Sequence, residues 1–283
     1  MKPDRRSTLS YRVGTSLAAL SAGLLTWLLW YIPLALLFQF PPAVAIAGMV
    51  ALSALFLRVY ALPSRWGARA RARSRVRRMS GRAWAWVALT APAMAGLSLG
   101  LWTALLATGM ATEVEFGEEV TKFLEKPGGE AAFYLLAVAV APLLEEFGFR
   151  GWIQRPLEKR WGAQAAIAVT AVLFALAHLE PQSVPVRLAA GLVLGHAVYA
   201  TRSIWAGVAL HVSWNAGVLA FGTALPDFDP AGKGWRWAAP AAGVAVLSLL
   251  WCAWTVRRMQ DETGRARPEG GTAARSRPVE SSS

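Results

Sequence analysis

Two adjacent glutamates, Glu145 and Glu146, stand in the otherwise apolar segment 141–149, which Arg150 follows directly. Ionisable side chains at membrane depth are costly and usually functional. Glu146 and Arg150 are four residues apart, so on a helix they share a face and can form an ion pair. Glu145 lies about 100° further round the helix and has no sequence-local partner. Its carboxyl group suits general acid or base catalysis; the alternative is that both acids form structural ion pairs.

Two further pairs of residues fall in apolar segments at the same four-residue spacing. Phe174 precedes His178, and His211 precedes Asn215. An imidazole in the same bundle as an unpaired glutamate could share a water molecule with it. His211 and Asn215 can both donate hydrogen bonds, which an oxyanion in a dry site needs. The alternatives are a satisfied buried histidine and an asparagine that links helices by a hydrogen bond.

The joint pattern resembles the CPBP family of intramembrane proteases, which includes the CAAX prenyl endopeptidases. The family shows Glu-Glu-x-x-x-Arg, then Phe-x-x-x-His, then His-x-x-x-Asn. The three motifs stand here as Glu145-Glu146…Arg150, Phe174…His178 and His211…Asn215. The resemblance covers about residues 131–221, which it implies form a catalytic core of four helices.

The resemblance also implies a role for each matching residue. Glu145 and His178 would activate the attacking water, and His211 and Asn215 would stabilise the tetrahedral oxyanion. Glu146 and Arg150 would hold the helix and help to position the substrate. The remaining histidine, His196, matches no motif. We expect it to pack in its own helix, where the spacing of Gly191 and Gly195 allows another helix to approach closely.

The resemblance implies a glutamate mechanism without a metal ion, so we expect no cofactor. Zinc is the alternative, because catalytic zinc sites use three protein ligands and a water molecule. Glu145, His178 and His211 would then be the ligands. The sequence lacks a His-Glu-x-x-His helix, since each histidine stands alone.

The composition predicts the membrane setting that these residues need. Hydrophobic residues make up 55% of the 283 residues and charged residues only 16%, against about 25% in soluble domains. Several apolar runs approach the roughly 20 residues of a spanning helix. We therefore predict an all-α, polytopic transmembrane helix bundle with about eight spans. The predicted helices cover residues 13–38, 43–57, 84–108, 131–157, 165–178, 186–200, 204–221 and 237–256.

The net charge of +12 is concentrated in an arginine-rich loop, residues 58–82, between two apolar runs. This distribution fits a cytoplasmic loop under the positive-inside rule and contact with anionic lipid headgroups, and we expect no nucleic-acid binding. The acidic loop, residues 113–130, would lie outside. Eight spans would place both termini in the cytoplasm.

The chain divides into five predicted parts. They are a basic N-terminus (1–12), accessory transmembrane helices with the two charged loops (13–130), the catalytic core (131–222), an outer turn with the last transmembrane helix (223–256), and a disordered polar tail (257–283). The arginine- and alanine-rich composition suggests a bacterial inner membrane protein. In the predicted topology His178 lies near the outer end of its helix, so the site would face the outer leaflet.

The predicted function is therefore an intramembrane endopeptidase that cuts a membrane-anchored protein near the membrane, as in C-terminal processing or sorting of exported proteins. One alternative is a membrane scaffold or bacteriocin-immunity protein that does not cleave. Another is a proton-coupled transporter, because buried Glu and His also form proton relays. A transporter would more commonly show repeated halves and broken helices, which this sequence does not suggest.

Overall fold

The computed structural model describes residues 9–61, 72, 74–112, 117–225 and 227–264. All the regular secondary structure within these ranges is helical. Seven helical segments are long and apolar enough to cross a membrane, and an eighth apolar helix is shorter. The chain is therefore a multi-pass membrane protein built as a helix bundle, as its composition predicts.

The bounds of the helices agree with the predicted ones to within a few residues. Outside the central composite helix they are α1 (Leu9–Leu36), the 3₁₀ turn η2 (Leu37–Gln39), α2 (Pro42–Tyr60), α4 (Gly81–Ala107), α5 (Glu118–Leu124), α9 (Ala163–Leu176), the 3₁₀ turn η5 (Pro181–Ser183), α10 (Val184–Thr201), α11 (Ile204–Ala224) and α12 (Trp235–Glu262). Local chemistry fixes several starts. Pro42 occupies the first position of α2, and the Ser80 hydroxyl accepts a hydrogen bond from the Ala83 amide at the start of α4.

The central element is one composite helix that changes its winding along its length. It consists of α6 (Gly129–Tyr134), the π-helix η3 (Leu135–Val140), α7 (Ala141–Glu145), the π-helix η4 (Glu146–Gln154) and α8 (Arg155–Trp161). Pro142 and Pro156 cannot donate backbone hydrogen bonds, so the regular ladder is interrupted beside both π-helices. Such π-helical turns are rare and often lie at functional sites.

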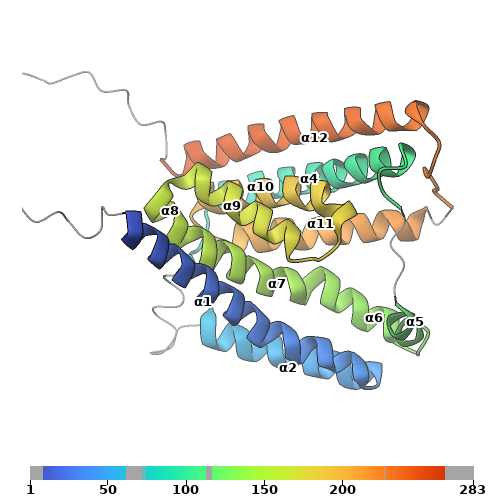
Figure 1. Ribbon diagram of the computed structural model, residues 1–283, viewed down its shortest axis with the longest axis horizontal. Coiled ribbons are helices and arrows are strands. Elements are labelled where there is room, and N and C mark those ends of the chain that lie inside the picture. The colour runs from blue at the N-terminus through green and yellow to red at the C-terminus, as the bar shows by residue number, and fades with distance from the viewer. Residues whose placement is uncertain (1–8, 62–71, 73, 113–116, 226, 265–283) are drawn as a thin grey trace, which may run out of the picture.

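The composite helix lies inside the bundle. In Figure 1, α4 and α12 run along one side, α1 and α2 run along the other, and α7, α10 and α11 lie between them. Close approach at glycines holds the layers together. A Cβ atom at Gly100 of α4 would lie 2.6 Å from the Ala241 carbonyl oxygen of α12, and one at Gly191 of α10 would lie 3.1 Å from Ala171 of α9.

The two ends of the bundle differ in charge. At one end, which we call the basic end, Arg160 of α8 bonds to the Thr15 hydroxyl of α1 at 2.6 Å. At the same end Arg82, at the start of α4, lies 3.9 Å from Glu262, at the end of α12. The start of α1 and the end of α12 therefore lie together (Figure 1), as an even number of crossings requires.

Two segments predicted as a polar tail and a loop contain helical residues. Helix α12 continues through residues 257–262, which we assigned to the polar tail, because Met259 is fully buried and keeps the last turns packed. Helix α5 also forms within the predicted acidic loop, where Lys122 pairs with Glu118 at 2.6 Å. Part of the arginine-rich loop, part of the acidic loop and most of the tail lie outside the described residues.

Candidate active site

A buried ion pair anchors the candidate site. Glu146 and Arg150 are both fully buried, and Arg150 Nη1 lies 2.8 Å from Glu146 Oε1, as their four-residue spacing predicts. The same carboxylate oxygen lies 3.0 Å from His211 Nδ1, so α11 is joined to the composite helix. Arg150 also donates to the Gly191 carbonyl oxygen of α10 at 3.3 Å. Glu146 is therefore the charge-neutralised member of the glutamate pair.

The second oxygen of Glu146 fits only because residue 207 is glycine. A Cβ atom at Gly207 would lie 2.3 Å from Glu146 Oε2 and 2.7 Å from Val198 Cγ2. Sequence reasoning missed this residue. The available signal was its spacing, because Gly207 precedes His211 by four residues and so shares its face of α11.

Glu145 has a different environment from its neighbour. Its side chain is buried, with 6% of the residue exposed, and Glu145 Oε2 lies 3.7 Å from His211 Nε2. That distance is too long for a direct hydrogen bond, so a small group or a water molecule could interact with both atoms. Arg187 of α10 and Tyr31 of α1 also interact electrostatically with Glu145. Glu145 is thus buried beside charges without being locked in an ion pair like that of Glu146.

Arg187 lies at the end of the bundle opposite the basic end, so the positive-inside rule does not account for it. The structure supplies a local reason for it. Arg187 pairs with Glu180 at 2.5 Å and donates to the Ser183 hydroxyl at 2.6 Å. Its charge also acts on Glu145. Sequence reasoning did not connect it to the site.

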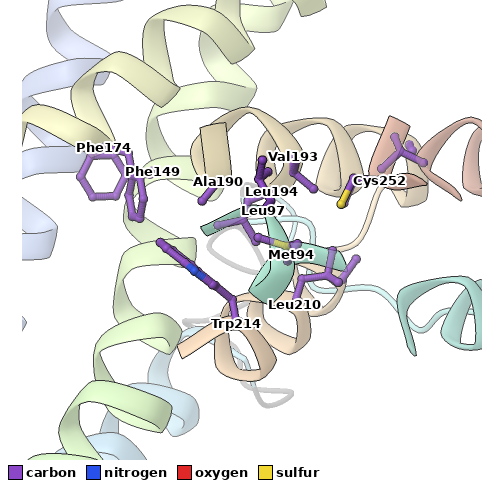
Figure 2. Packing of buried hydrophobic residues seen from close by; sticks show 14 of the residues in the cluster. Met94, Leu97, Phe149, Phe174, Ala190, Val193, Leu194, Leu210, Trp214 and Cys252 are labelled. Carbon is purple, nitrogen blue, oxygen red and sulfur yellow. The ribbon is translucent and has the colours of Figure 1, made fainter. Parts of the chain in front are cut away.

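Aromatic rings line the cluster and separate its polar groups. The Arg150 guanidinium carbon lies 4.5 Å from the Phe174 ring centroid, a cation–π contact. The Phe174 ring also meets His178 at 5.0 Å and His211 at 5.5 Å. Trp214 stacks on His211 at 5.1 Å. Figure 2 shows Phe174 beside Phe149 in the buried cluster that continues to Trp214.

His178 lies in the turn that ends α9. The helix stops at Leu176, and Leu179 has a left-handed backbone (φ 56°) that turns the chain towards η5. His178 Nδ1 lies 2.8 Å from the Phe174 carbonyl oxygen. Among the hydrogen bonds of the described residues, none joins His178 to Glu145. His178 therefore meets the cluster through the Phe174 ring, at its half-buried edge.

Asn215 lies one turn beyond His211 on α11. Its Nδ2 donates to the Ala137 carbonyl oxygen at 2.7 Å, in the π-helical segment η3. This bond links two helices, which is the structural role considered for Asn215 from the sequence. An asparagine amide carries two N–H donors, so one remains for another acceptor.

A polar row extends from the site towards the basic end. Glu146, Arg150, Gln154 and Glu158 follow one another at four-residue intervals along the composite helix. Gln154 donates to the Gly195 carbonyl oxygen at 3.0 Å and to Glu158 Oε1 at 2.9 Å. Only the first two members were singled out from the sequence, although the regular spacing of all four was visible there.

The remaining histidine, His196, lies outside the cluster. His196 Nδ1 lies 2.8 Å from the Leu192 carbonyl oxygen and its Nε2 lies 3.1 Å from Gln164 Oε1, so both ring nitrogens have partners outside the cluster.

Within the described part of the chain, no group of three or more His, Cys, Asp or Glu side chains is placed to hold a metal ion. Glu145, His178 and His211 are therefore not arranged as a ligand set in this structure.

Comparison with known proteins agrees with the motif pattern. Residues 127–217 match the family model described as type II CAAX prenyl endopeptidase Rce1-like. No curated protein and no solved structure matches the chain. The matched segment contains every residue of the three motifs, and it supports intramembrane endopeptidase activity in general. Residues 127–217 are accordingly similar to the Rce1-like CAAX prenyl endopeptidases, which confirms the resemblance seen in the sequence.

Proposed function

We propose that this chain is an intramembrane endopeptidase that hydrolyses a peptide bond near the membrane end of a membrane-anchored protein. The observation that carries the proposal is the contrast between two adjacent buried carboxylates. Glu146 is held by Arg150 and His211, whereas Glu145 faces His211 Nε2 across 3.7 Å. Neighbouring acids in different environments are a usual way to separate a catalytic group from a supporting one.

Glu145 is the general base in this proposal, with His178 helping to hold the water. The carboxylate accepts a proton from the water as its oxygen attacks the carbonyl carbon of the scissile bond. The tetrahedral intermediate then breaks its C–N bond, and Glu145 returns the proton to the leaving amine. The products are a new carboxyl group and a new amino group. No cofactor enters this scheme, and the chelator experiment below tests that expectation.

His211 and Asn215 are the proposed oxyanion donors. Glu146 accepts a hydrogen bond from His211 Nδ1 in this proposal, and Nε2 is directed towards the same space as Glu145. His211 therefore acts as the protonated imidazolium, the form in which both ring nitrogens donate. Asn215 lies one turn further along α11 and keeps one amide proton beyond its bond to Ala137. Donors that are fixed before the reaction stabilise developing charge without reorganisation at the moment of reaction. Arg150 and Glu146 hold the His211 ring in position and do not take part in proton transfer.

The charge distribution suggests which side the substrate reaches. The basic end of the bundle would face the cytoplasm under the positive-inside rule, with both termini on that side of a bacterial inner membrane. His178 lies in the α9–η5 turn with Glu180, at the opposite end from Arg160 and Thr15. We therefore propose an outward-facing site and exported, membrane-anchored substrates, such as proteins processed near their C-terminus.

A reconstituted cleavage assay tests the proposal. The full chain in liposomes is mixed with a reporter that carries a soluble domain, a linker and one C-terminal transmembrane helix, and products are identified by mass spectrometry. We expect a cut in the linker beside the membrane. An intact reporter after long incubation, across reporters with different linkers, would contradict endopeptidase activity.

A chelator arm tests the chemistry separately. The same assay is run after treatment with a strong chelator, and again after zinc is added back. We expect equal cleavage in all three samples. Activity that is lost on chelation and returns with zinc would contradict the proposed mechanism but not the proposed activity.

A further inference from the structure

Two adjoining cavities open at the basic end, away from the candidate active site. The first, of about 570 Å³, lies between α1 and α8. The second, of about 720 Å³, lies between α8 and the segments around residues 75–77 and 199–202. Both contain Ala72, Arg155 and Lys159 in their walls. Each volume falls in the range of roughly 300–1,000 Å³ that small-molecule sites occupy.

The walls of the two cavities are strongly cationic. Six basic side chains line one or both of them: Arg75, Arg77, Arg155, Lys159, Arg160 and Arg202. Among the described residues that line them, Glu158 is the single acid. Its carboxylate is already engaged by both terminal nitrogens of Arg75 and by Gln154. The other five basic side chains therefore have no free carboxylate in the cavity walls to pair with.

Arg155 stands between the cavities and has an unused donor. Its Nη1 is buried and has no hydrogen-bond partner among the described residues. Arg75 and Arg77 act on Arg155 as like charges, and Glu158 acts as the single opposite charge. A buried donor without an acceptor costs free energy, and an anion bound in the cavity would supply the acceptor and offset the repulsion.

The first cavity also has an apolar wall. Ala18, Ala19 and Ala22 of α1 line it opposite Arg155, Lys159 and Arg160. These alanines belong to a helix whose large apolar residues are exposed along its length, including Leu17, Leu25 and Leu29. A small-residue wall that leads from a cationic pocket onto a lipid-facing helix suits a molecule with an anionic head and an acyl chain. Basic pockets between transmembrane helices on the cytoplasmic side bind such headgroups.

We propose that the two cavities form a binding site for the phosphate group of an anionic phospholipid. The phosphate sits against Arg155 and Lys159, which line both cavities, and one acyl chain follows the alanine wall of α1. The site lies at the end of the polar row that starts at Glu146, so it is separate from the proposed chemistry. It does not depend on the proteolytic activity.

Native mass spectrometry of the purified full chain tests the site. The protein is equilibrated with phosphatidylglycerol or phosphatidylcholine, and bound lipid is counted as the lipid concentration rises. We expect tight binding of phosphatidylglycerol alone. The double variant Arg155→Gln/Lys159→Gln should bind it about 30-fold more weakly, since each basic residue contributes roughly a factor of five at an anionic lipid surface.

A matched control removes two cations from the other end of the molecule. Lys233→Gln/Arg236→Gln changes the net charge equally, and both residues are exposed. We expect this variant to bind phosphatidylglycerol like the unchanged protein. Equal weakening in both double variants, or equal binding of the two lipids, would overturn the site. Thermal unfolding followed by tryptophan fluorescence checks that the variants fold, and Lys159→Gln alone, at an exposed residue, provides a milder variant.

Two further arms separate a lipid from a soluble phosphate. We expect millimolar inorganic phosphate to leave bound phosphatidylglycerol in place. We also expect Ala18→Phe, which fills the apolar wall at an exposed residue, to weaken lipid binding. If free phosphate displaces the lipid completely and Ala18→Phe has no effect, the site binds a soluble phosphate compound and the lipid assignment is wrong.

Discussion

The composite helix and α10 differ from the helices that flank them in where their residues face. In their most apolar stretches, 61% of the residues of the composite helix and 56% of those of the η5–α10 segment are buried within the protein, against 11% for the α1–η2 segment and 22% for α12. Both buried stretches lie within the segment that matches the Rce1-like family model, and the composite helix carries the buried Glu145, Glu146 and Arg150. The flanking stretches face outward with leucine, valine and tryptophan. The buried charged cluster is thus enclosed by helices whose outer faces are apolar.

The two regions are also held together differently. Lipid tails are as apolar as leucine, so helices in a membrane associate through close packing and hydrogen bonds. Between α4 and α12 these include the close approach at Gly100, a buried hydrogen bond between Thr90 and Thr255 at 2.8 Å and an exposed one from Trp251 Nε1 to the Leu89 carbonyl oxygen at 2.8 Å. Inside the matched segment, the buried polar side chains of Glu146, Arg150 and His211 bind one another. The same kind of change should therefore have a larger effect in the matched segment than in the flanking helices.

The largest expected effect on stability comes from breaking the buried ion pair. Arg150→Met leaves Glu146 charged, buried and without its guanidinium, which should lower the free energy of unfolding by about 3–5 kcal/mol. The measurement is reversible unfolding in detergent, followed by tryptophan fluorescence. The exposed pair Lys122–Glu118 has the same four-residue spacing, so Lys122→Met is the control and should change nothing measurable.

The double variant Glu146→Gln/Arg150→Met sharpens that test. It removes both charges, so it should recover part of the stability that Arg150→Met loses. Equal loss in the single and double variants would mean that packing around Arg150, and not an unpaired Glu146, limits stability.

The next effect concerns activity. In His211→Asn the side-chain amide can still donate to Glu146 in place of Nδ1, but the group at the Nε2 position is gone. Removing one oxyanion donor typically lowers kcat by about 10²–10³-fold, and we expect a loss of that size in the reporter assay with an almost unchanged unfolding temperature. Near-normal kcat in this variant would contradict the role of His211 as an oxyanion donor and leave only its hydrogen bond to Glu146.

A smaller effect is expected at Gly207. In Gly207→Ala the new Cβ would meet Glu146 Oε2 at 2.3 Å, so the carboxylate or α11 must shift. Overpacking of this kind costs about 1–3 kcal/mol, and activity should fall with stability because His211 shifts too. Gly222 lies on the same helix, and a Cβ atom added there would have no such neighbour within 4 Å. Gly222→Ala is therefore the control, and destabilisation equal to that of Gly207→Ala would contradict the steric explanation.

The smallest effect lies in the flanks. Thr90→Val removes the buried hydrogen bond to Thr255, and such bonds between membrane helices contribute about 0.6 kcal/mol on average. We expect a small fall in the unfolding temperature and unchanged cleavage of the reporter. Loss of cleavage at normal stability would show that α4 and α12 shape the active site as well as enclosing it.

Most of the fold could be predicted from sequence patterns because the features they report are local. Hydropathy predicted eight helical segments, and the spacing of Glu146 and Arg150 predicted their ion pair. The motifs also predicted the family match. Helix ends were harder to place, because buried residues such as Met259 extend α12 beyond the apolar run that marks it.

Contacts between helices could not be predicted from the sequence patterns, for a physical reason. A periodic pattern fixes which residues share a face, but not the depth or rotation of one helix relative to another. The bond between His211 and Glu146 joins residues 65 positions apart, and the Phe174 ring contacts both His178 and His211. The π-helices η3 and η4 also change which residues share a face. The cationic cavities require basic residues from three separate segments, around residues 75, 155 and 202.

The most direct test of the proposed chemistry replaces the base and follows the water. The membrane-anchored reporter is cleaved in ¹⁸O-labelled water by the unchanged protein, by Glu145→Gln and by Glu130→Gln, an exposed control on the same composite helix. We predict one ¹⁸O in the new carboxyl group for the unchanged protein and the control, and a rate lower by about 10²–10⁴-fold for Glu145→Gln. Cleavage by Glu145→Gln at the normal rate would contradict the assignment of Glu145 as the base.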